Sequence, residues 1–102
     1  MQSEGSLREL RAFHRALGDV TRMRIVQLLA TDGELTVTDL RTRLHVSQPL
    51  LTWHLHRLRR AGIVVSDRHG REVLCSLDRT RFAELHQRGF RVLMNRPVVG
   101  AA

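Results

Sequence analysis

The chain has 102 residues, an apolar share of 42% and one cysteine, Cys75. This length allows one domain with a small core, and a single cysteine excludes both an intrachain disulfide and a CxxC-type zinc site. All seventeen basic residues are arginines and oppose ten acidic residues, so the formal charge of +7 favours a polyanionic partner. The codon bias of a GC-rich genome would also explain the choice of arginine, but not the net charge.

The sequence contains no sign of a membrane segment or an export signal. No apolar run approaches the ~20 residues of a membrane span, and the first residues, MQSEGSLREL, do not resemble a signal peptide. We therefore expect a cytoplasmic protein with no membrane partner. We also expect a single domain over residues 1–102, with its core at about residues 6–96 and loose ends.

Two amphipathic helices are predicted at the start of the chain. Ser6 and Glu9 form a capping box, and apolar residues at helical spacing then continue to about Leu17. Gly18 ends this helix, and Asp19 caps a second helix, DVTRMRIVQLLATDG. The second helix is predicted to be the most buried, because it carries an apolar stripe of Val20, Met23, Val26 and Leu29, widened by Ile25 and Leu28.

A helix-turn-helix follows in the next segment of the chain. Thr36 and Asp39 repeat the capping pattern before a short third helix that carries Val37, Leu40 and Leu44. Residues 45–46 then form a tight connection to a fourth helix, SQPLLTWHLHRLRRAG. This spacing predicts a helix-turn-helix with the fourth helix as its second member.

The fourth helix carries its own start and stop signals. Ser47 can cap the N-terminus, Pro49 fits the first turn, and Gly62 supplies a left-handed stop. At 100° per residue, one face is apolar and the opposite face carries donors, cations and an aromatic ring. The inward face holds Leu51, Leu55 and Leu58, and the outward face holds Pro49, Trp53, His56, Arg57 and Arg60. Such a helix suits a DNA major groove.

An alternating pattern after the fourth helix predicts a β-hairpin. Ile63–Asp67 and Glu72–Leu77 read as antiparallel strands joined near His69 and Gly70. A hairpin directly behind a recognition helix is a wing. Arg68 and Arg71 flank its tip, where they could reach a phosphate or a minor groove; the alternative is that they are only solvated.

Asp78 is predicted to cap a last helix, RTRFAELHQRGFRVLMNR, which ends before Pro97. This helix carries more apolar surface than a terminal helix needs to cover its own domain. We expect part of that surface to form a dimer seam with the first helix; packing within one chain is the alternative. The candidate dimer residues are Leu7, Leu10, Phe82, Leu85, Gly89, Val92 and Leu93, with Phe90 and Met94 on a neighbouring strip.

Three stretches of the chain, ALGDVTRMRIVQLL, ELTVTDL and SQPLLTWHLHRLRRAGIV, resemble the motifs of one known family. That family is the ArsR/SmtB family of bacterial winged-helix repressors, and the resemblance covers about residues 13–94. It implies a mainly α fold with a small β-hairpin, in the order ααααββα. It also implies a cytoplasmic homodimer, nucleoid-associated when bound, that places two recognition helices in successive major grooves of a palindromic double-stranded operator and responds to an effector.

The resemblance also implies which side chains approach DNA. Gln48 suits adenine through a bidentate amide pair, and Arg57 or Arg60 suits guanine or phosphate. Trp53 departs from the family motif and could contact thymine methyl groups or the sugar backbone. His54 matches a family histidine, but it lies at the edge of the core face, so a packed structural role is the alternative. The candidate DNA-binding residues are Ser47, Gln48, Pro49, Thr52, Trp53, His56, Arg57, Arg60, Arg68 and Arg71.

The two metal sites of the family have no matching ligands in this chain. Thr36 and Thr38 stand where one site has cysteines, so a soft-metal thiolate site is ruled out there. The positions aligned with the second site hold Arg79, Arg81, Val92 and Asn95, so that site is absent as well. Cys75 is expected to be a small core residue; a redox role is the less favoured alternative.

Histidine side chains elsewhere in the chain could still bind a metal effector. His14 on the first helix and His86 on the last could meet near a dimer seam, with Glu84 or Asp78. Nickel or zinc would suit such a site, although the sequence assigns no cofactor. An organic ligand, a protein co-regulator or no effector at all are alternatives.

A DNA-binding regulator is the leading interpretation, and two other classes compete with it. A winged-helix module that docks protein or structured RNA would use the same helices as a scaffold. An enzyme is disfavoured because the sequence offers no Ser/His/Asp or paired-carboxylate spacing and no phosphate loop.

Overall fold

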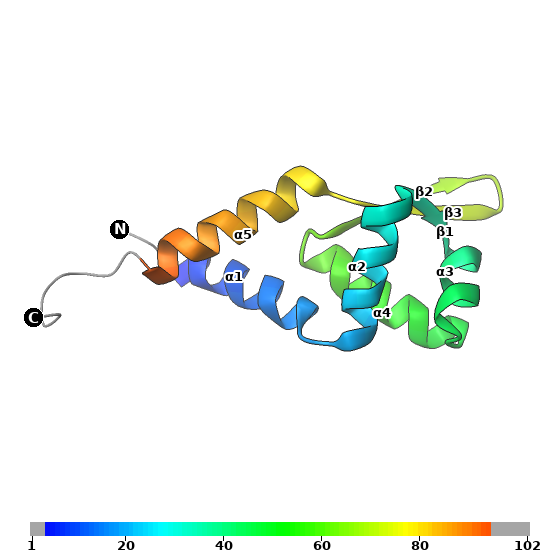
Figure 1. Ribbon diagram of the computed structural model, residues 1–102, viewed down its shortest axis with the longest axis horizontal. Helices are drawn as coiled ribbons and strands as arrows, with labels where there is room; N and C mark the ends of the chain where they lie inside the picture. Colours follow the sequence, from blue (N-terminus) through cyan, green and yellow to red (C-terminus); the bar gives the residue numbers. More distant parts are fainter. Residues whose placement is uncertain (1–3, 95–102) are drawn as a thin grey trace, which may run out of the picture.

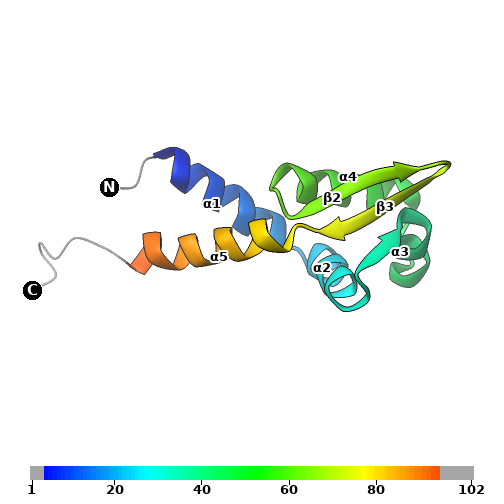
Figure 2. The same ribbon diagram turned by 90° about the horizontal axis from the view of Figure 1, so that it is seen from above.

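The structure, a computed structural model, describes residues 4–94. Within that range the element order is α1 (Glu4–Leu17), α2 (Val20–Asp32), β1 (Glu34–Thr36), α3 (Val37–Leu44), α4 (Gln48–Arg60), β2 (Val64–His69), β3 (Glu72–Leu77) and α5 (Arg79–Met94). Figures 1 and 2 show α1 and α5 together at one end of the molecule and the β2–β3 hairpin at the other. This is the predicted winged helix-turn-helix, with one additional strand.

The additional strand, β1, makes the wing a three-stranded antiparallel sheet in the order β1-β3-β2. Leu35 of β1 lies opposite Cys75 of β3, and both side chains are buried. The β2–β3 pairing runs from Val64 opposite Leu77 to the end of the hairpin. Sequence patterning missed β1 because three residues are too few to show an alternation of apolar and polar side chains.

The predicted N-caps after the first helix are confirmed. Asp19, Thr36 and Asp78 each accept a hydrogen bond at 3.0 Å from the backbone amide three residues later. The start of α1 was predicted wrongly, because the helix begins at Glu4 and Ser6 lies inside its first turn. The last helix was predicted to reach residue 96, and residues 95 and 96 lie outside the described part of the chain.

The apolar stripe predicted for α2 is confirmed in part, because Ile25 and Leu29 are buried and Val26 and Leu28 pack against the core. Val20 and Met23 are 64% and 45% exposed, whereas the inward face holds Arg22, Ile25 and Leu29. An arginine occupies a core-facing position, so the rotation of the helix cannot be found from apolar residues alone. The most buried helix is also not α2, because α4 buries more of its residues.

The core draws side chains from all five helices and from the wing. Leu51, Leu55 and Leu58 of α4 have at most 2% of their surface exposed, as the helical wheel predicts. They pack with Phe13, Ile25, Leu29, Leu40, Ile63, Cys75 and Leu85. This packing anchors the leucine face of α4 in the core and leaves the opposite face of the helix at the surface.

Candidate nucleic-acid interface

The two ends of α4 are set by local hydrogen bonds. Ser47 Oγ accepts a hydrogen bond from the Leu50 amide at 3.3 Å, which confirms the predicted N-cap. At the other end, Gly62 has a φ of 80° and its amide donates to the Arg59 carbonyl, while the Ile63 amide donates to the Leu58 carbonyl, both at 3.0 Å. This pair of bonds is a Schellman motif and confirms the glycine stop.

The predicted outward side chains of α4 are exposed, with the exception of Arg57. Trp53 is 50% exposed, and Arg57 is partly buried. The other exposed members of the set are Gln48, Pro49, Thr52, His56 and Arg60. Since α4 contains no acidic residue, its free face carries only neutral and positive groups. A hollow borders this face on each side, one toward the wing and one toward α1.

The hollow toward the wing, which we call the wing hollow, has a volume of about 380 Å³. It brings Gln48 and Thr52 of α4 together with Arg68 and Arg71 of the hairpin. Sequence reasoning missed two further arginines of its lining, Arg41 of α3 and Arg59 of α4. The spacing within α4 places residue 59 on the same side as residues 48 and 52, so this position could have been found.

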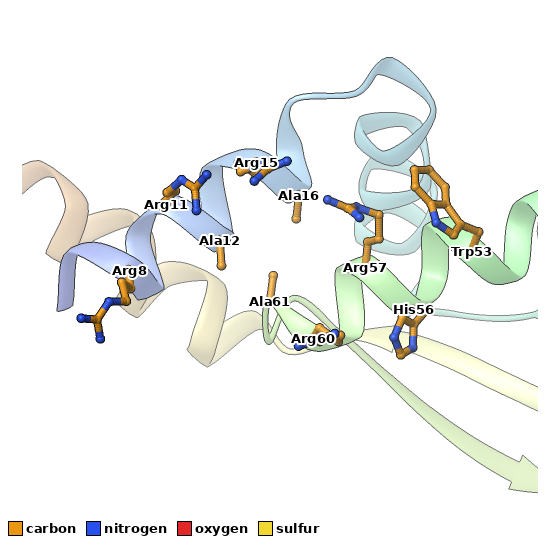
Figure 3. A pocket seen from close by; sticks show the side chains of 10 residues that line it. All are labelled: Arg8, Arg11, Ala12, Arg15, Ala16, Trp53, His56, Arg57, Arg60 and Ala61. Carbon is orange, nitrogen blue, oxygen red and sulfur yellow. The ribbon is translucent and has the colours of Figure 1, made fainter. Parts of the chain in front are cut away.

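The hollow toward α1, which we call the α1 hollow, has a volume of about 300 Å³ (Figure 3). Four predicted DNA-binding residues line it, namely Trp53, His56, Arg57 and Arg60. Sequence reasoning missed the opposite wall, which is formed by Arg8, Arg11 and Arg15 of α1. Their i, i+3, i+7 spacing marks one helix face, but only the fold brings that face next to α4.

Trp53 stacks against arginine side chains from two helices. The guanidinium carbon of Arg57 lies 5.0 Å from the centre of the indole ring, and that of Arg22 lies 5.4 Å from it. Both separations are within cation–π range. Arg22 itself is only 7% exposed, so it contacts the indole from the buried side. The Trp53 side chain is still half exposed to solvent.

The Arg22 side chain also ties α1 to α4. Its Nε donates to the Ala16 carbonyl at 2.7 Å, and its Nη1 donates to Nδ1 of His54 at 3.0 Å. His54 is 5% exposed, so the packed structural role that was left open for this histidine is the one observed. Because arginine only donates, His54 Nδ1 must accept, which requires a neutral imidazole.

Burial lowers the pKa of His54 below the ordinary histidine value. Asp19, with a carboxylate oxygen 3.9 Å from Nδ1, opposes this shift, while Arg22 and Arg57 add to it. In the unfolded chain His54 takes up a proton as the pH falls through about 6.5, and in the folded protein it resists that proton. The contribution of His54 to stability is therefore complete above about pH 6.5 and is lost as the pH falls toward the lower folded pKa.

We therefore expect the free energy of unfolding to fall between about pH 7.5 and about pH 5.5, and to fall less in His54→Asn, whose amide oxygen can still accept from Arg22. Urea unfolding at the two pH values measures the difference. His69→Asn, on the exposed hairpin, is the matched control and should keep the wild-type dependence. An equal pH dependence in His54→Asn and the wild type would contradict the prediction.

The family's metal positions do not fit a metal ion in this structure. Thr36 Oγ1 caps α3, Arg79 donates to the Ala30 carbonyl, and Arg81 pairs with Glu9 and Glu84. Across residues 4–94, no group of three or more His, Cys, Asp or Glu side chains is arranged to hold a metal ion.

Among its described residues, the structure does not bring the alternative metal candidates, His14 and His86, into a shared site with a carboxylate. His14 Nδ1 donates to the Leu10 carbonyl at 2.8 Å, and His86 is exposed on α5. Of the carboxylates named with them, Glu84 pairs with Arg81 and Arg88, and Asp78 caps α5. Cys75 is fully buried, as expected of a core residue, and burial raises the pKa of its thiol.

The candidate dimer residues divide into a packed set and an exposed set. Leu10 and Leu85 are buried within the chain, and a Cβ on Gly89 would lie 3.5 Å from Leu10 and from His14 of α1. The close approach at Gly89 is thus made inside one chain. Phe82 and Val92 are partly buried. The apolar residues that remain exposed on α1 and α5 are Leu7, Phe90, Leu93 and Met94.

Residues 17–67, half of the chain, match a protein-family model described as a helix-turn-helix domain. The transcriptional repressor SdpR of Bacillus subtilis is 32% identical over 66 residues, which cover 65% of this chain and 72% of SdpR. The arsenic resistance transcriptional regulator ArsR1 of Pseudomonas putida is 44% identical over 59 residues, 58% of this chain and 46% of ArsR1. The chain belongs to the ArsR/SmtB family of helix-turn-helix transcriptional regulators.

The fold of this ArsR/SmtB chain agrees with a solved relative over most of its length. An ArsR-like transcriptional regulator from Rhodococcus sp. RHA1 superposes with a TM-score of 0.78 at 28% identity, covering 89% of this chain and 85% of that one. The chain spans about half the length of the first curated ArsR/SmtB relatives that it matches. These relatives are named as regulators or repressors, and none of the three is named as an enzyme. No helix within residues 4–94 is both long enough and apolar enough to cross a membrane.

Proposed function

We propose that this protein is a transcriptional repressor that binds a palindromic DNA operator as a homodimer. The observation that carries the proposal is the free face of α4, which is anchored by three buried leucines and flanked on both sides by arginine-lined hollows. A helix of this kind can enter a major groove while the arginines beside it contact the phosphate backbones.

Base recognition is assigned to the outward face of α4. Gln48 is exposed at the helix start and can form a bidentate pair with adenine. Arg57 and Arg60 lie two to three turns further along and suit guanine or phosphate. Arg68 and Arg71 extend from the wing toward the same hollow as Gln48, which favours backbone or minor-groove contacts beside the recognition helix.

Dimerisation is assigned to the exposed apolar residues of α1 and α5. Leu7, Phe90, Leu93 and Met94 are each at least 46% exposed. They lie in the helices at the end of the molecule opposite the wing (Figure 2). A second copy that covers them would join two recognition helices, as a palindromic site requires. We propose no metal ligand set, because neither the family positions nor His14 and His86 supply one; a protein co-regulator or another effector stays an open prediction.

A fluorescence titration tests the operator proposal. A labelled duplex from upstream of the protein's own gene is compared with a random duplex at two salt concentrations, and the emission of Trp53, the single tryptophan, is recorded in parallel. We expect specific, salt-dependent binding that changes the Trp53 emission. Gln48→Ala and Arg57→Ala should each weaken operator binding by on the order of 1 to 3 kcal/mol while leaving the dimer intact.

Two matched variants control for nonspecific effects. Gln27→Ala and Arg24→Ala make the same changes at exposed positions of α2 that line neither hollow and should bind as the wild type does. Unchanged affinity in both α4 variants would remove the proposed docking mode. Equal affinity for the upstream and random duplexes would instead favour a winged-helix module that docks protein or RNA.

A further inference from the structure

The arginines of α1 form a stripe that the α4 and wing interface does not account for. Arg8, Arg11 and Arg15 recur at i, i+3 and i+7, and all three line the α1 hollow. Within residues 4–94, the guanidinium groups of Arg11 and Arg15 make no hydrogen bond or ion pair. The stripe covers roughly 10 Å along the helix axis, at 1.5 Å per residue.

Two arginines of α5, Arg81 and Arg88, pair with acidic side chains. On another side of α1, Glu9 pairs with Arg81 and Arg88 of α5, and these pairs lower the pKa of Glu9. Glu84 pairs with the same two arginines. Glu9 and Glu84 are therefore committed to arginines of α5, and neither pairs with Arg11 or Arg15.

The α1 hollow combines a basic rim with a floor of small residues. Its lining contains no acidic side chain, and Arg57 and Arg60 of α4 face the stripe from across the hollow. Ala12 and Ala16 of α1 and Ala61 after α4 leave the space between the two helices open (Figure 3). Arg11 and Arg15 of α1 and Arg57 and Arg60 of α4 bring four positive charges to a hollow of about 300 Å³, so an anion among them lowers their mutual repulsion. The chemistry of the hollow therefore calls for phosphate groups.

We propose that the Arg8, Arg11 and Arg15 stripe binds backbone phosphates of the operator between the two half-sites. The hollow is continuous with the α4 face, since Trp53, His56, Arg57 and Arg60 belong to both. Because Arg57 and Arg60 already face DNA in the proposed docking mode, a duplex that follows α4 also passes over the α1 stripe. The interface with DNA thus extends from the wing, across α4, to α1.

The position of the stripe points to the centre of the operator. Leu7, at the start of α1, belongs to the exposed apolar face assigned to the dimer, and the arginines lead from there back toward α4. Two stripes would then meet near the two-fold axis and connect the two recognition helices. This inference rests on the proposed function, because it requires a dimer bound to a palindromic site.

A salt titration of the double variant Arg11→Gln/Arg15→Gln tests the inference. Each lost phosphate contact lowers the slope of log affinity against log salt by about 0.9, so we expect a decrease of about 1.8 per protomer and about 3.6 per dimer. Binding should weaken by the same factor on operator and random duplexes, because phosphate contacts carry no sequence information. Arg8 is kept, so that its other interactions stay intact.

The control is Arg24→Gln/Arg91→Gln, which removes the same charge from two exposed arginines that line neither hollow. Within residues 4–94, neither side chain makes a hydrogen bond or an ion pair. The slope of log affinity against log salt for this control should change by less than the value of about 0.9 that one phosphate contact contributes. If the two double variants have equal slopes while the wild type still prefers its operator, the inference is wrong and the proposed function stands. If the wild type shows no operator preference, both are wrong.

Neutral methylphosphonate linkages locate the contacts on the DNA. Replacing single phosphates between the half-sites should weaken binding of the wild type and have little further effect on Arg11→Gln/Arg15→Gln. Replacing phosphates beside the wing should weaken both proteins equally. If the central replacements weaken both proteins by the same factor, or weaken neither, the α1 stripe does not bind there.

Discussion

Arg22→Ala is expected to lower the free energy of unfolding by on the order of 3 kcal/mol. The guanidinium donates to the Ala16 carbonyl and to His54 Nδ1, and at 3.4 Å to the Arg15 carbonyl, so it caps the end of α1 and holds α4 at the same time. Alanine leaves buried acceptors without donors, each at a cost of about 1 to 3 kcal/mol. Removing a buried charge offsets part of this loss, but alanine cannot fill the vacated space.

Urea unfolding monitored by circular dichroism measures the effect, with Arg24→Ala on the exposed side of α2 as the control. The control should stay within about 0.5 kcal/mol of the wild type. Arg22→Lys keeps the charge but cannot supply the separate donors of the guanidinium, so it should fall between the two. An Arg22→Ala protein as stable as the control would show that this buried network does not hold α1 and α4 together.

The same substitution should change the surface of α4. Arg22 lies on one side of the Trp53 ring, and Arg57 also stacks on it. Without Arg22 the indole loses a contact that orients it from inside the protein, so its fluorescence should respond even in the folded state. Stability and the orientation of a candidate DNA-contacting side chain are thus linked through one buried arginine.

Features that depend on neighbours in the sequence could be predicted from it. The caps at Asp19, Thr36, Ser47 and Asp78 join a side chain to an amide three residues away, and the Gly62 stop uses bonds within the last turn of α4. Features that depend on distant partners could not be predicted. The rotation of α2 is set by Arg22, whose acceptors lie in α1 and α4, and β1 exists only through its pairing with β3.

The candidate site divides in the same way. The outward face of α4 follows from helical periodicity, and the flanking positions of Arg68 and Arg71 follow from the hairpin. The arginine stripe of α1 has the spacing of any solvated helix face. Its role depends on the packing of α1 beside α4, which no local pattern encodes. Likewise, periodicity placed Leu85 and Gly89 on an apolar face, but only the fold distinguishes their contacts with α1 from a seam between two chains.

Phe90→Glu/Leu93→Glu is expected to convert the proposed dimer into a monomer and to abolish tight operator binding. Phe90 and Leu93 are 68% and 56% exposed in the single chain, so glutamate is tolerated there before association but not within an apolar interface. Burial of each side chain stabilises the dimer by about 1.5 to 3 kcal/mol. Losing both, from each protomer, should raise the dissociation constant of the dimer at least about 100-fold.

Sedimentation velocity gives the oligomeric state, and the operator titration gives the affinity. Gln27→Glu/Thr31→Glu adds the same charge to two exposed positions of α2, outside the helices of the proposed dimer face, so this control should remain dimeric and bind as the wild type does. A monomer that still folds should show only the weak binding of one half-site, because the second recognition helix is no longer attached to the first. A Phe90→Glu/Leu93→Glu protein that remains dimeric would exclude this face of α5 as the seam. A wild type that is monomeric would exclude it as well and would require the operator to assemble the two copies.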